Sequence, residues 1–154
     1  MNWLVFDLEA NGLLEEATHA HVACWTNHRG QSDYTTDVQD FCNILSCAND
    51  QSIIIAHNCI DYDLPLLKKL YGYEHKGHVL DTVVLSRLLN PERVGRHSLD
   101  AWGERLGVAK PKHEDWSTYS PEMLHRCQQD VEINVRVLHA LLKEADMTLE
   151  EMYE

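Results

Sequence analysis

The first third of the chain alternates short apolar runs with turn-forming residues. Apolar and β-branched runs that stop at turn residues such as Asn11-Gly12 are typical of buried strands. A segment that alternates polar and apolar side chains is typical of a strand with one buried face. The predicted strands cover residues 2–8, 18–26, 32–36 and 52–56, and residues 79–80 leave room for a short fifth strand.

The rest of the chain has apolar positions at helical spacing. Asp81 is placed to cap one helix, Gly107 to end the next, and Ser120-Pro121 to start the last. The predicted helices cover residues 38–48, 64–71, 82–89, 98–106 and 121 to about 145, with a polar loop at 110–120. Strands interleaved with helices predict one mixed α/β domain over residues 1–154.

Composition narrows the class of protein. The net charge of −12 disfavours tight binding of nucleic acid by phosphate neutralisation, and it predicts weak, salt-sensitive binding without metal ions or a partner. No long apolar run occurs and the N-terminus lacks a basic region, so neither a membrane helix nor a signal peptide is expected. Five cysteines without a Cys-x-x-Cys pair fit reduced thiols in an intracellular protein.

Two acids follow the apolar part of the first predicted strand. Asp7 and Glu9 stand two residues apart, so their side chains point to the same side of the strand. Neighbouring like charges are costly unless a cation joins them, which makes the pair a candidate metal site. A polar strand end that runs into a turn explains the same spacing equally well.

Two further acids lie later in the chain. Asp63 follows the strand at 52–56, where α/β sheets place ligands, although it could simply cap the next helix. Asp130 lies among apolar residues of the last helix, where a solvated position is the simpler explanation for it taken by itself. His125 precedes Asp130 by five residues, about 140° around an unbroken helix. The two can share a site only if the helix bends or loosens between them.

The four carboxylates are informative as an ordered set. Carboxylates from two strand ends and a late helix can converge, and oxygen ligands favour Mg²⁺ or Mn²⁺ over zinc. Two such ions about 4 Å apart stabilise the attacking and leaving oxygens of a phosphodiester. A nearby histidine can accept the proton of the attacking water. The set therefore indicates metal-dependent hydrolysis of phosphodiesters.

The order of these segments resembles the DEDD, or DnaQ-like, 3′-to-5′ exonucleases. FDLEANGLL resembles their first motif and IIAHNCIDYDLPLL their second, whereas DTVVLSRLL and HSLDAWGERLG resemble the proofreading domain of family A polymerases from short-tailed phages. The resemblance spans roughly residues 3–142. It implies a ribonuclease H-like fold with a mixed five-stranded sheet flanked by helices. The implied activity releases nucleoside 5′-monophosphates from 3′ ends of single-stranded DNA by a two-metal-ion mechanism.

The resemblance also assigns roles to residues. Two divalent cations, Mg²⁺ or Mn²⁺, would be held by Asp7, Glu9, Asp63 and Asp130; the motif spacing selects Asp63 rather than Asp61. The implied substrate contacts are Ala10, Asn11, Leu13 and Asn58, of which Leu13 matches a leucine that packs against the terminal base. His97 and Trp102 are expected to support the fold.

The third motif departs from the polymerase pattern. Proofreading domains of polymerases carry tyrosine four residues before the last aspartate, and this chain has Arg126 there. His125 has instead the spacing of the DEDDh subgroup, so we expect it to act as the general base. The alternative is that the tyrosine was lost, the site is impaired and His125 is an ordinary surface residue.

The sequence leaves three functions in competition. The first is the DNA exonuclease, and the second is an accessory role, either as a proofreading subunit for a separate DNA polymerase or as a non-catalytic module. The third keeps the chemistry but acts on RNA or short oligonucleotides, since no residue is identified that would read a 2′-hydroxyl. The phage resemblance implies a phage-encoded protein in the host cytoplasm, without a membrane partner. The acidic tail, residues 144–154, is expected to be solvated surface or a fraying end.

Overall fold

A mixed five-stranded sheet forms the centre of the computed structural model, which describes residues 2–48, 52–108 and 115–153. The strands are β1 (Asn2–Ala10), β2 (Ala20–Asn27), β3 (Ser32–Thr35), β4 (Ser52–Ala56) and β5 (Val79–Asp81). Their order is β3-β2-β1-β4-β5; the β3-β2-β1 pairings are antiparallel, whereas β4 and β5 continue the sheet in parallel. The sheet matches the ribonuclease H-like expectation, and its fifth strand is the short one that the sequence left room for.

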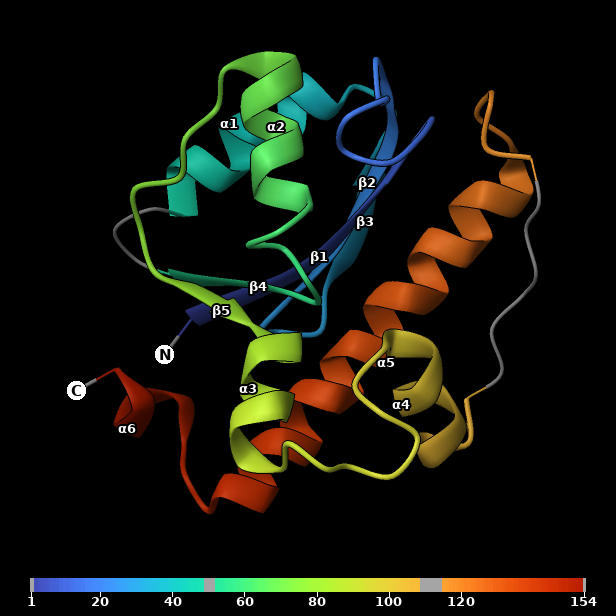
Figure 1. The fold of residues 1–154 in the computed structure, drawn as a ribbon. Coiled ribbons are helices and arrows are strands. Elements are labelled where there is room, and N and C mark those ends of the chain that lie inside the picture. Colours follow the sequence, from blue (N-terminus) through green and yellow to red (C-terminus); the bar gives the residue numbers. More distant parts are fainter. Residues whose placement is uncertain (1, 49–51, 109–114, 154) are drawn as a thin grey trace.

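Helices cover both faces of this sheet (Figure 1). The helices α1 (Val38–Ala48) and α2 (Asp63–Tyr71) lie on one face. On the other lie α3 (Thr82–Leu89), α4 (Leu99–Leu106) and the long α5 (Pro121–Ala145). None of the helices described is both long and apolar enough to cross a membrane.

Alternation along β1 decides which side chains face α5. Phe6 and Leu8 belong to the core on the side of α1 and α2, whereas Val5 belongs to the core shared with α5. Because strand side chains alternate, Asp7 and Glu9 continue the Val5 side and point toward α5. The first pair of acids is therefore directed at the helix that carries the last one.

The segment that resembles the phage domains between α3 and α4 has a structural role, as expected. His97 Nδ1 lies 2.7 Å from Ser86 Oγ, and the buried Trp102 donates its indole N–H to the same oxygen at 3.1 Å. The guanidinium groups of Arg93 and Arg105 lie over the Trp102 ring at 4.7 and 4.8 Å from its centroid. These contacts hold α4 and the preceding loop against α3.

Most described residues of the acidic tail are exposed, as expected of solvated surface, but the tail does not fray. It folds into the short helix α6 (Leu149–Met152), with a capping box between Thr148 and Glu151. Leu149 is buried, and Tyr153 donates its hydroxyl proton to the Val79 carbonyl at 2.8 Å. A buried leucine and a hydrogen bond to β5 fix the tail to the sheet, although five of its eleven residues are acidic.

Candidate active site

Asp7 and Glu9 lie where α5 crosses β1. Their carboxylates and the thiol of Cys127 on α5 each place one potential ligand atom within 4.8 Å of the others, the only such group among the described residues. The Cys127 thiol also donates to the backbone carbonyl of Asp7 at 3.5 Å. Helix and strand are thus in direct contact beside the two acids.

Electrostatic coupling joins all four acids that the sequence singled out. Burial raises the pKa of Glu9 well above its usual value, and the charges of Asp7 and Asp130 raise it further. Burial likewise raises the pKa of Asp63, with the charge of Asp7 adding to the effect. The charges of acids on β1, α2 and α5 therefore influence one another, although only Asp7 and Glu9 belong to the group whose potential ligand atoms lie within 4.8 Å of one another.

The segment between β4 and α2 carries Asp63 into this site. Asp81, at the end of β5, accepts hydrogen bonds from the backbone N–H groups of Asn58 at 2.8 Å and Ile60 at 3.1 Å. It also caps α3 by accepting from Val83, as its sequence position predicts. The same carboxylate thus caps a helix and holds the loop that delivers Asp63.

Two neighbouring aspartates of this segment differ in burial. Asp63 is 3% exposed, whereas Asp61 is exposed. The choice of Asp63 as the ligand, which comes from the motif spacing, stays a prediction. Between them, Tyr62 donates its hydroxyl proton to the Gly12 carbonyl at 2.8 Å. Burial raises the pKa of Tyr62 to about 12, and the charges of Asp63 and Glu9 contribute. Tyr62 therefore lies at the edge of the site. Its position depends on the hydrogen bond to Gly12, which could not be predicted from the sequence.

α5 delivers Asp130 on a buried face of an unbroken helix. Arg126, four residues earlier, lies about 40° from Asp130 around the helix, whereas His125 lies about 140° away. His125 is exposed, and the bend or loosening that it would need is absent from the described helix. The structure thus does not bring His125 to the acids, and its role as a base stays a prediction that requires the first turns of α5 to rearrange.

Known proteins share both the sequence pattern and the fold. No family model matches the chain. The DNA polymerase of Enterobacteria phage T3 is 28% identical over 92% of the chain, which spans only 27% of that polymerase. NrnC of Brucella melitensis, solved bound to pGG, has a TM-score of 0.72 at 20% identity, covering 94% of this chain and 73% of NrnC. Escherichia coli RNase D has a TM-score of 0.71 at 15% identity, covering 94% and 40% of the two chains. The chain is a DnaQ-like exonuclease domain.

The similar proteins also bear on the expected cofactor. NrnC has been solved with bound Mg²⁺, one of the two cations expected from the sequence. Neither the number of cations nor the DEDDh subgroup follows from these similarities. Both therefore remain predictions for this exonuclease domain.

The four predicted substrate contacts fall into two pairs. Leu13 is 73% exposed and Asn58 is exposed, so both side chains can be reached from solvent. Ala10 is buried, and the Asn11 side chain accepts hydrogen bonds from the backbone N–H groups of Thr18 and His19, which it uses to close the loop after β1. Leu13 and Asn58 are the better placed candidates in this exonuclease domain.

Sequence reasoning missed two residues of α5 beside the acids. Arg126 was treated only as a departure from the family pattern, yet its charge acts on Glu9 and opposes the rise in the pKa of that carboxyl group. Cys127 was not considered as part of the site. The signal was available, because both residues precede Asp130 by three or four positions and therefore share its helix face.

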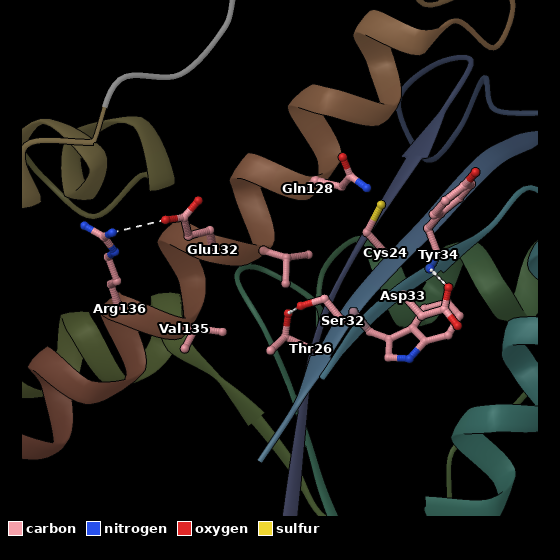
Figure 2. Close-up of a pocket in the computed structure, with 11 residues that line it drawn as sticks. Cys24, Thr26, Ser32, Asp33, Tyr34, Gln128, Glu132, Val135 and Arg136 are labelled. Atoms are coloured by element: carbon pink, nitrogen blue, oxygen red, sulfur yellow. Dashed lines mark hydrogen bonds and ion pairs between the residues drawn. The ribbon is translucent and has the colours of Figure 1, made fainter. Parts of the chain in front are cut away.

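Two pockets border the site region. One, of about 850 Å³, adjoins the loop after β4. Among the residues that the structure describes, its lining has three arginines and two histidines but no acid, namely His57, Asn58, Val83, Arg87, Pro91, Arg93, Gly95, Arg96, His97, Ser98 and Leu99. The other, of about 590 Å³, lies between α5 and the strands β2 and β3, with Gln128, Glu132 and Val135 on its helix side (Figure 2). The helical repeat places His125 on the stripe that leads to this second pocket rather than to the acids.

Proposed function

We propose that the chain is a metal-dependent 3′-to-5′ exonuclease that hydrolyses terminal phosphodiesters of single-stranded DNA and releases nucleoside 5′-monophosphates. The observation that carries the proposal is the convergence of four carboxylates, in which burial and mutual repulsion raise the pKa values of Glu9 and Asp63. Such a cluster is costly to ionise unless cations neutralise it. The family resemblance then selects phosphodiester hydrolysis among metal-dependent reactions.

The donor set fits hard divalent cations. Asp7, Glu9, Asp63 and Asp130 all offer carboxylate oxygens, which Mg²⁺ and Mn²⁺ prefer. Two such cations, when bound, would stabilise charge on the attacking and leaving oxygens. Burial raises the pKa of Cys127 well above its usual value, so the thiol stays protonated. We therefore assign Cys127 to holding β1 against α5 rather than to binding metal.

The arginine-lined pocket gives the phosphate backbone a place beside the site. Arg87 and Arg96 are exposed and form no ion pair with a described residue, in a chain of net charge −12. Asn58 lines the same pocket and belongs to the loop that ends at Asp63. A strand could therefore contact these cations while its 3′ end reaches the acids, and salt should weaken this contact.

Degradation of short oligonucleotides is the second candidate function. NrnC, which was solved bound to pGG, is covered over 73% of its length by this chain, against 27% for the T3 polymerase. The polymerase relation supports instead a proofreading role for a separate DNA polymerase, with which the chain would then co-purify. RNA remains in competition with DNA under either candidate.

Strands labelled at either end test the proposed function. With Mg²⁺ or Mn²⁺ we expect a 5′-labelled strand to shorten stepwise, whereas a 3′-labelled strand releases its labelled mononucleotide at once. Asp63→Asn should abolish both reactions, and Asp61→Asn, which changes an exposed acid of the same segment, should leave them intact. Equal persistence of the substrate with the wild-type protein and with Asp63→Asn would refute the proposal. Matched DNA and RNA strands, each as dinucleotides and as longer chains, rank the candidate substrates.

A further inference from the structure

The first turns of α5 place a permanent positive charge beside the acidic cluster. Arg126 precedes Asp130 by one helical turn and shares its face. Its charge is felt at Glu9, where it opposes the effect of burial and of the neighbouring acids. A guanidinium group remains protonated at all physiological pH values, so it cannot replace the tyrosine or histidine as a proton acceptor.

Aromatic packing positions this guanidinium group. Its central carbon lies 5.6 Å from the centroid of the Trp116 ring, a distance typical of a cation–π contact. The partly buried Trp116 packs against the core shared by β1, β2 and α5. Its carbonyl oxygen lies 2.9 Å from Nε2 of the buried His21 on β2. The loop that supports Arg126 is thus tied to the sheet at the strand that pairs with Glu9.

We propose that Arg126 is a catalytic residue that binds a non-bridging oxygen of the scissile phosphodiester and stabilises the charge that develops there. Trp116 is the positioning residue that holds the guanidinium group in place. The inference rests on the proposed function, because it requires a phosphodiester at the four acids. Arginine suits this task, since its planar fork forms paired, charge-assisted hydrogen bonds with phosphate oxygens. A donor held in place before the reaction acts most strongly where charge develops.

Substitution of Arg126 tests the inference through kcat. Arg126→Ala should lower kcat for a single strand by about 100-fold, the usual effect of removing one such donor. Arg126→Lys should recover part of the loss, because it restores the charge but not the fork. Methylguanidinium added to Arg126→Ala should restore activity. Arg136→Ala, which removes the same charge from an exposed position of the same helix, should show neither loss nor rescue.

A second readout does not depend on cleavage. Removing a positive charge beside Glu9 should tighten the binding of Mn²⁺ to the substrate-less protein, measured by calorimetry, in Arg126→Ala but not in Arg136→Ala. A purely structural arginine would instead lower the melting temperature and weaken Mn²⁺ binding. An unchanged kcat in Arg126→Ala, or a loss that neither lysine nor methylguanidinium relieves, would overturn the inference.

Failure of the proposed function gives a different result. If the wild-type protein cleaves no strand, the proposed function fails, and the Arg126 inference is then decided by equilibrium binding. A fluorescent, nuclease-resistant phosphorothioate strand should bind Arg126→Ala several-fold more weakly than Arg136→Ala. Equal affinities would reject a phosphate contact for Arg126.

Discussion

The acidic side of the site and its approach side are built in different ways. The acidic side, Asp7, Glu9, Asp63 and Asp130, stands on β1, on the start of α2 and on the body of α5. The approach side, residues 115–126, consists of an irregular loop and the first turns of α5. Sheet register and helix packing fix the first, whereas the contacts of the second include the ring contact of Arg126 with Trp116 and the hydrogen bond of Trp116 with His21.

This difference separates what the domain shares with its relatives from what is particular to it. The acids occupy the order and spacing that the family resemblance assigns to metal ligands, so the proposed reaction depends on them. The approach side carries Arg126 where the phage polymerase domains carry tyrosine, and there the proton acceptor and the contacts with the substrate can differ. We therefore expect substitutions on the acidic side to have the largest effects.

Metal ions and pH should affect the acidic side most strongly. The folded pKa values of Glu9 and Asp63 are raised above their unfolded values of about 4, so folding favours their protonated forms. The stability that their protonation contributes is fully present below the unfolded pKa and is lost as the pH rises through the folded pKa. The metal-free protein should thus lose stability as pH rises from about 4 toward neutrality, and Mn²⁺ should restore it most at neutral and higher pH.

Asp63→Asn isolates this effect. It removes a buried charge, so we expect it to raise the free energy of unfolding of the metal-free protein near neutral pH by about 1–2 kcal/mol and to reduce the stabilisation by Mn²⁺. Denaturant unfolding with and without Mn²⁺ measures both quantities. The exposed Asp61→Asn serves as the control. A lower free energy of unfolding for Asp63→Asn would show that burial and neighbouring acids do not destabilise the ionised Asp63 carboxylate.

The positions of the residues on the acidic side could be predicted because they depend on patterns between residues close in the sequence. Alternation along a strand puts Asp7 and Glu9 on one side, and a strand end followed by a helix start places Asp63. What the sequence could not supply are contacts between distant segments, such as the hydrogen bonds from the Asn58 and Ile60 backbone to Asp81. The role of Asp81 was therefore predicted only in part.

The approach side and the tail were predicted less well, for different reasons. Helical geometry separates His125 from Asp130 by about 140°, but the spacing alone does not say whether the helix is broken. In the tail, the readable signal was overlooked: Thr148 and Glu151 have the spacing of a capping box, and the surrounding acids hid a single buried leucine. Motif spacing thus predicts which residues belong to a motif, but it does not predict which face of the helix they occupy.

The arginine-lined pocket should set affinity rather than turnover. We expect Arg87→Gln combined with Arg96→Gln to raise KM by about 10-fold, with kcat unchanged, because these cations contact phosphates away from the acids. The slope of log affinity against log salt should become shallower by about 1.4, the release expected for two phosphate contacts on a single strand. A variant with Arg29→Gln and Lys143→Gln carries the same charge change elsewhere, and matching slopes in the two variants would exclude a strand path over this pocket.

Trp116 should have a smaller effect on the approach side. Trp116→Phe keeps an aromatic ring beside Arg126 but weakens the cation–π contact, so we expect kcat to fall by about 2–5-fold. Trp3→Phe, on the part of β1 that packs against His139, controls for the loss of an indole ring. Comparable kcat values in the two variants would show that Arg126 does not depend on its aromatic support.

His125→Ala should have the smallest effect if α5 keeps the described helix during the reaction. The side chain is exposed and faces away from Asp130, and surface substitutions usually change free energies by less than about 0.5 kcal/mol, or about 2-fold in kcat. A general base would instead contribute about 10²- to 10⁴-fold and would leave an ionisation near neutral pH in the pH dependence of kcat. A loss of that size, with Arg126→Ala active, would show that the first turns of α5 unwind to bring His125 to the acids. The substitutions of His125 and Arg126 therefore decide which of the two adjacent residues takes part in the reaction: His125, which has the motif spacing, or Arg126, which shares the helix face of Asp130.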